Sequence, residues 1–259
     1  QVIMKRWHII SVLLFSYFFF LSANIPASRV LNNLQQKGNL PAIFYGVQGT
    51  VWQGHADSVL IPGQPKLENL DWSVNPFALL LARLSAGIET EIHKQHVSGH
   101  ISWHYFGGDL YISDTEARLP AKTLQQIIEL PLGELGGEFE FYIDSIHWQP
   151  ETTPQIEAEI FWQHAKLALT QTVDLGQVNI SISTDDAGQT RIAFTNSGGE
   201  LNMNGEASTG TDRNYILNIT LKPKDPTGET AQSLNLFAQR QADGSYVFKH
   251  NGNLGQLGF

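Results

Sequence analysis

Apolar and polar residues alternate along most of the chain after residue 50. Leu70, Trp72 and Val74 fall on one side of such a segment, while Asn69, Asp71, Ser73 and Asn75 fall on the other. A strand with one buried face produces this period of two. The same alternation recurs at residues 97–105, 139–143, 156–162, 178–182 and 215–221. Together with weaker segments, the pattern predicts roughly a dozen strands.

Short clusters of turn-forming residues separate these strands. They lie at residues 107–109, 185–188, 197–199 and 243–244. Such close spacing is typical of hairpins, so we expect an antiparallel sheet. About a dozen hairpin-linked strands do not stay flat, and their twist should curl the sheet into a half-barrel or trough.

Helical patterns are few and short. Pro26 is placed to open one that ends near Lys37, and Asn75 with Pro76 forms a cap and first turn for a second at residues 77–84. Two more are expected at residues 120–130 and 230–240. The sequence therefore predicts a mainly β domain over residues 41–259 with two or three short helices, and a short repeated string suggests two lobes divided near residues 120–131.

Residues 7–25 form the one long apolar segment, rich in isoleucine, leucine and phenylalanine and without formal charge. A spanning helix needs about 20 such residues. Lys5 and Arg6 precede it, which favours a cytoplasmic N-terminus. We expect a cytoplasmic tail at residues 1–6, a transmembrane helix at 7–25 and a stalk at 26–40. A cleaved signal peptide is the competing interpretation, because it also combines a basic start with an apolar stretch.

Charge and cysteine content limit the kinds of partner and site that this protein can have. The formal charge of -9 and sixteen basic residues without a stripe argue against nucleic acid. The absence of cysteine excludes disulfides and thiolate metal sites.

Candidate chemistry is weak. His96, His100 and His104 share a strand face, close to His93, but His100 and His104 lie about 13 Å apart on a strand, too far for one tetrahedral zinc. Paired acids alternate with apolar residues or lie in a turn, as solvent-facing residues do: Glu89 with Glu91, Glu138 with Glu140, Glu157 with Glu159, and Asp185 with Asp186. No nucleophile elbow, phosphate loop or metalloprotease motif is present. We therefore expect no enzyme activity, no catalytic residue, no cofactor and no metal site.

One string is far more specific than the rest. It contains Gly46, Gly49, Thr50, Trp52 and Gly54, and is followed by Leu70, Trp72 and Pro76. The glycines mark turns or close backbone approaches, while the threonine and tryptophan favour an extended strand.

These residues resemble the type II secretion system protein N family. Gly99 before Ile101, the helix from Pro120, the stretch at residues 196–201 and Pro223 follow in the order that the resemblance predicts. The resemblance implies a single-pass protein of the Gram-negative inner membrane whose stalk and β-domain are periplasmic. It also implies a non-enzymatic accessory component that contributes to assembly or function of the protein-export machinery, with other secretion-system components of the inner membrane and periplasm as partners.

The same glycine and tryptophan pattern also resembles AsmA-type proteins. That resemblance implies an apolar groove that binds or transfers lipid, and fold alone does not decide between the two functions. In either case Trp52, Trp72, Trp103 and Trp162 are candidate contacts for a partner or lipid. The alternative for each tryptophan is burial in the core.

Overall fold

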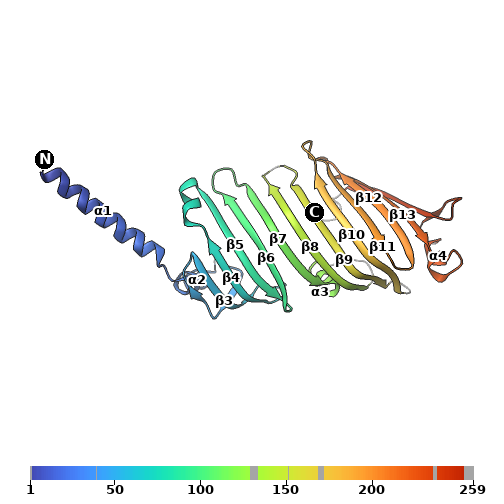
Figure 1. Cartoon of the computed structure of the whole chain (residues 1–259), viewed down its shortest axis with the longest axis horizontal. Coiled ribbons are helices and arrows are strands. Elements are labelled where there is room, and N and C mark those ends of the chain that lie inside the picture. Colours follow the sequence, from blue (N-terminus) through green and yellow to red (C-terminus); the bar gives the residue numbers. More distant parts are fainter. Residues whose placement is uncertain are drawn as a thin grey trace. The chain divides into compact units, whose positions relative to one another are not determined.

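The computed structural model describes residues 2–38, 40–128, 134–150, 152–168, 172–235 and 238–253 (Figure 1). The chain divides into two compact units, Gln1–His93 and Lys94–Phe259. This boundary lies earlier in the sequence than residues 120–131, where the sequence suggests a division between lobes.

The first unit begins with two helices, α1 (Val2–Ala23) and α2 (Ala27–Gln36). Among the described residues, no helix combines the length and the apolar character needed to cross a membrane. The predicted transmembrane helix at residues 7–25 is therefore wrong, and so is the single-pass inner-membrane placement built on it. Although α1 has 22 residues, Lys5, Arg6 and His8 occupy its first turns.

The strands of the first unit form an antiparallel sheet with the order β1-β3-β4-β5, in which β2 also pairs with β3. The strands are β1 (Ile43–Tyr45), β2 (Gln48–Gly49), β3 (Gln53–Leu60), β4 (Leu67–Val74) and β5 (Arg83–Ile92). A 3-10 helix, η1 (Pro76–Leu81), connects β4 to β5. The side chain of Asn75 caps it by accepting the Phe77 N–H at 3.0 Å, so the predicted helix start is confirmed.

The second unit is also an antiparallel sheet, whose order follows the sequence from β6 to β13 and ends β15-β14. Its strands are β6 (Gln95–His104), β7 (Leu110–Pro120), β8 (Glu134–Trp148), β9 (Gln155–Ala168), β10 (Thr172–Thr184), β11 (Thr190–Ser197), β12 (Leu201–Thr209), β13 (Asn214–Pro223), β14 (Gln239–Arg240) and β15 (Tyr246–Asn253). The helices are α3 (Ala121–Ile128) and α4 (Glu229–Leu234). In the part of the chain that the structure describes, β6 and β14 do not pair with each other, so this sheet is open and not a closed barrel. The prediction of a mainly β, antiparallel protein with few short helices is confirmed.

The core of the second unit lies on one face of its sheet, beside α3. Strand register places Phe139 opposite Trp162 and Trp162 opposite Val178, so these side chains share that face. They form a buried cluster with other apolar residues: Ala121, Leu135, Ala165, Leu175 and Leu201. The rings of Phe139 and Trp162 stack with centroids 5.0 Å apart. The alternation in the sequence thus becomes one apolar face, and α3 lies against β7 and β8 at the end of the sheet that holds this core.

Candidate interaction site

The most specific string of the sequence folds into a tight turn between β2 and β3. Thr50 organises it, because its Oγ1 accepts the backbone N–H groups of Trp52 (3.3 Å) and Gln53 (3.1 Å). The Thr50 N–H in turn donates to the Gln53 carbonyl at 2.8 Å. Gly49 has φ of 80°, and a Cβ atom there would lie 2.8 Å from the Cα of Gly54. Only glycine combines that backbone conformation with such a close approach.

The two tryptophans of the string point their indole N–H groups at backbone carbonyls of the same unit. Trp52 donates to Ser22, in the last turn of α1, at 2.7 Å. Trp72 donates to Thr50 at 3.2 Å, and its six-membered ring lies directly over Gly54. Both side chains are half-buried. The indole N–H groups of both residues thus stabilise the turn by hydrogen bonds to the backbone, and neither N–H group is left for a ligand.

The turn also holds the junction between α1 and α2. The Val51 N–H donates to the Ile25 carbonyl at 3.1 Å, and Thr50 forms an antiparallel bridge with Pro26. Ala27, the first residue of α2, is only 1% exposed. The remaining residues of the string are structural as well: Gly46 has φ of 64°, Leu70 lies opposite the buried Ala56, and Pro76 opens η1. The string therefore joins the N-terminal helices to the sheet.

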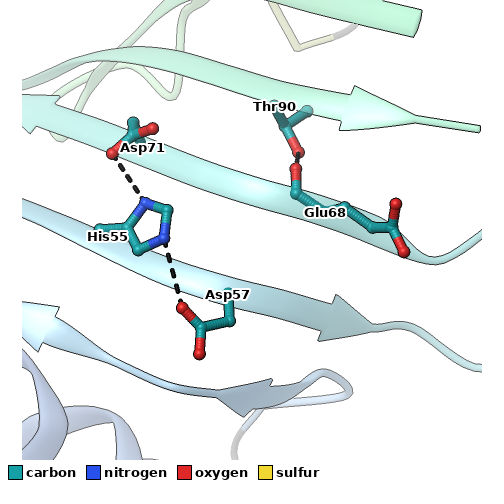
Figure 2. Close-up of polar contacts among 5 residues, drawn as sticks. All are labelled: His55, Asp57, Glu68, Asp71 and Thr90. Carbon is teal, nitrogen blue, oxygen red and sulfur yellow. Dashed lines mark hydrogen bonds and ion pairs between the residues drawn. The ribbon is translucent and has the colours of Figure 1, made fainter. Parts of the chain in front are cut away.

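A polar cluster follows the turn on β3 and β4 (Figure 2). His55 places Nδ1 2.9 Å from Asp71 Oδ1 and Nε2 3.4 Å from Asp57 Oδ1. The Nδ1 contact with Asp71 is a hydrogen bond, whereas the longer Nε2 contact with Asp57 is an ion pair only when the ring is protonated. The nearby Thr90 hydroxyl donates to the Glu68 carbonyl at 2.9 Å and not to the ring. His55 and Asp71 face each other across the ladder, so the contact stabilises strand register.

Sequence reasoning missed this cluster because it compared acidic residues only within a strand. The available signal was the alternation of His55 and Asp57 on one strand, combined with the hairpin that brings Asp71 opposite His55. Within the described ranges, no group of three or more histidine, cysteine, aspartate or glutamate side chains is arranged to hold a metal ion. His96 and His100 are exposed, while His104 Nδ1 is buried without a hydrogen-bond partner.

The other two predicted tryptophans lie on the second unit and differ sharply. Trp162 is 9% exposed and donates its indole N–H to the Gly136 carbonyl at 2.8 Å. Trp103 is 40% exposed and packs edge-on against Tyr105. Register places Trp103 opposite Leu110, and Leu110 opposite Trp148, which is also 40% exposed. The structure thus places Trp162 in the core and Trp103 on a surface.

This surface, the aromatic end of the sheet, consists of Trp103, Leu110 and Trp148 with Tyr105 and Phe106 at the adjoining turn. Tyr105 and Phe106 are exposed, and their rings meet edge-on with centroids 5.3 Å apart. Helix α3 begins after Pro120, at the other end of β7 from Leu110. Ten residues of strand separate the two positions by about 33 Å. The sheet face that α3 helps to bury at one end is therefore exposed at the other.

Comparison with known proteins identifies the family of the chain. Residues 44–249 match the sequence model of the family described as type II secretion system (T2SS), protein N. The chain belongs to the type II secretion system protein N family. This family is an accessory component of type II secretion and is not a known family of enzymes.

Two relatives of the protein N family align with four-fifths or more of the chain. One is type II secretion system protein N from Vibrio cholerae serotype O1, 25% identical over 243 residues, which covers 89% of this chain and 92% of the relative. Another, with the same name, is from Klebsiella pneumoniae and is 24% identical over 219 residues, covering 80% of each chain. No solved structure matches this chain. The matched residues include the Thr50 turn and the aromatic end of the sheet, so both features lie within the region that the family model covers.

Proposed function

We propose that this protein is a non-enzymatic accessory component of type II secretion, which contributes to assembly or function of the export machinery by binding other components of it. The family match, which extends from residue 44 to residue 249 and thus into both compact units, carries the proposal. The chemistry of the described sites agrees with it. The residues of the Thr50 turn are used to build the fold, while the aromatic end of the sheet leaves large apolar side chains in solvent.

The aromatic end is the surface that we assign to partner binding. Tryptophan and tyrosine dominate the energetics of protein interfaces, because they combine large apolar area with few rotatable bonds. Tyr105 and Phe106 are 68% and 78% exposed, so neither is needed to complete the core. A partner that covers them gains apolar burial without disturbing the sheet.

A photo-crosslinking amino acid at Tyr105 tests this assignment in cells that express the other secretion components. We expect a crosslinked product that contains a type II secretion component. The same crosslinker at Gln64, an exposed residue of the β3–β4 hairpin, is the control and should give no such product. Recovery of no secretion component from Tyr105, with the protein present at normal levels, would argue against the proposal.

A lipid-binding function is the second candidate, and the same exposed sheet face favours it. Trp103 and Trp148 lie in one row, and the next row inward contains Ile101, Ile112 and Ile146, the first of them 38% exposed. Such a surface fits an acyl chain as well as a protein side chain. Native mass spectrometry of the protein purified from cells separates the two possibilities. Co-purified lipid that disappears in a Trp103→Ser variant supports lipid binding, and its absence from the wild type removes this candidate.

A further inference from the structure

The 3-10 helix η1 exposes apolar side chains that the fold does not use. Phe77, Leu80 and Leu81 are 67%, 83% and 78% exposed. Leu79 and Leu84 also lie in solvent, and none of the residues of η1 is buried. The segment at residues 76–82 contains no polar side chain. Sequence reasoning identified the helix start at Asn75 and Pro76 but gave no sign that the apolar side of the helix would face outward.

The backbone of this segment is already hydrogen-bonded. Pro76 has no N–H, the Phe77 N–H donates to the Asn75 side chain, and the Ala78 N–H donates to the Asn75 carbonyl at 3.3 Å. The backbone N–H groups that follow are paired by the hydrogen bonds of the 3-10 helix, and at its end the Ala82 N–H donates to the Leu79 carbonyl at 3.0 Å. A backbone whose N–H groups are all paired internally can leave water without the penalty that hydrocarbon imposes on unpaired groups.

The lack of polar side chains in the patch argues against a protein as its occupant. Four large side chains, each more than two-fifths exposed, offer on the order of a few hundred Å² of apolar surface. A stable protein interface buries roughly 800 Å² on each partner and has a polar rim with about one hydrogen bond per 100–200 Å². The segment at residues 76–82 provides no polar side chain for such a rim, unlike the aromatic end, where Tyr105 carries a hydroxyl and the tryptophans an indole N–H.

We propose that η1 is a peripheral contact with a phospholipid bilayer, in which Phe77, Leu80 and Leu81 insert into the interfacial region without crossing the membrane. The occupant is the bilayer surface and not a single bound lipid. Because the inserted residues carry no charge and the whole chain has a net charge of -9, the contact does not depend on anionic headgroups. It is independent of the proposed secretion role and of the aromatic end of the sheet.

Site-specific fluorescence tests the contact on the full chain. The protein has no cysteine, so Leu80→Cys carries a single environment-sensitive dye at the most exposed leucine of η1. Gln64→Cys is the matched control, because it is exposed in the same unit at the opposite end of β4. With neutral phosphatidylcholine vesicles, we expect the dye at residue 80 to gain intensity severalfold and shift to the blue. Quenchers attached to the acyl chains should then quench it, while the dye at residue 64 stays in water.

A second variant separates insertion by η1 from attraction by another part of the chain. Changing both Leu80 and Leu81 to serine should weaken partition into the same vesicles by at least about tenfold, since two leucines that would insert into the bilayer are lost. Changing the exposed Ile216 of β13 to serine is the control and should leave partition unchanged. Unaltered dye fluorescence at residue 80, or equal quenching at residues 64 and 80, would overturn the proposal. If the dye at residue 80 changes its spectrum without vesicles when the protein concentration is raised, η1 binds a second copy of the chain and the proposal is overturned. If the change without vesicles instead requires a secretion component, η1 binds a protein partner, which also overturns the proposal.

Discussion

Replacing Gly54 by alanine tests whether the Thr50 turn is a structural joint. A Cβ atom at residue 54 would meet the indole ring of Trp72, with Cε2 at 2.7 Å, and would lie 2.7 Å from the Gln48 carbonyl oxygen. Real Cβ atoms do not tolerate such distances, so Trp72 has to move. Overpacking of this kind costs about 1–3 kcal/mol. Loss of the Trp72 hydrogen bond to Thr50 adds about 0.5–1.5 kcal/mol, so we expect the free energy of unfolding to fall by roughly 2–4 kcal/mol.

Urea denaturation followed by tryptophan fluorescence measures this change. Gly63→Ala is a matched control in the same unit: it introduces a Cβ at φ of 78° but meets no atom within 4 Å, so it should cost only the backbone strain of about 1 kcal/mol. Combining Gly54→Ala with Trp72→Phe removes the colliding part of the indole and should recover part of the stability, which appears as a favourable coupling energy. A Gly54→Ala protein as stable as the Gly63→Ala protein, or a pair of substitutions whose effects simply add, would refute the packing account of this turn.

Two further predictions address the second unit. Trp162→Ala should lower the free energy of unfolding by about 3–5 kcal/mol, because it leaves a cavity in the core beside Phe139. Trp103→Ala should change this free energy by less than about 1 kcal/mol, because that ring lies on the surface. Equal effects of the two substitutions in urea denaturation would contradict the assignment of Trp162 to the core and Trp103 to the surface. The pKa of Asp243 is lowered, chiefly by the hydrogen bond from the Ser245 side chain and then by the Ser245 backbone N–H. A depressed carboxyl pKa contributes stability that is present above its unfolded value and is lost as pH falls through the folded value. Ser245→Ala should therefore raise the Asp243 pKa in a carboxyl NMR titration and reduce the loss of stability on acidification, and an unshifted titration would show that the side-chain hydrogen bond is not the cause.

The strands were predictable because half-buried sheet faces impose a period of two on the sequence. The segment at residues 178–182 shows this directly, since Val178 and Ile180 share the apolar face in the observed register with β9. Helix caps were predictable for a similar local reason, as at Asn75. These features depend on neighbours within a few residues, which the sequence shows.

The roles of individual side chains were less predictable because they depend on distant parts of the chain. Trp103 and Trp162 occupy equivalent alternating positions, yet only Trp162 lies at the core end of its sheet. The pairing of His55 with Asp71 depends on hairpin register, and the Trp52 hydrogen bond reaches back to Ser22 over 30 residues. The N-terminal helix is a further difference: the sequence predicts a membrane-spanning segment at residues 7–25, but no helix among the described residues is long and apolar enough to cross a membrane.

Sequence reasoning identified only one residue, Trp103, of the surface that we propose for partner binding. Trp103 was a candidate, but Tyr105, Phe106 and Trp148 join it only through a turn and the pairing of three strands. A sequence places these residues apart, while the sheet gathers them at one end.

Protein export itself is the most direct test of a role in type II secretion. The measurement is the fraction of a type II substrate that reaches the medium in the source bacterium, compared between the wild type, a strain that lacks this protein and that strain complemented with the gene. We expect the substrate to accumulate inside the deletion strain and the wild-type gene to restore its release. A gene with Tyr105→Ser and Phe106→Ser should restore release less well, at equal protein level. Unchanged substrate release in the deletion strain would contradict a role in type II secretion.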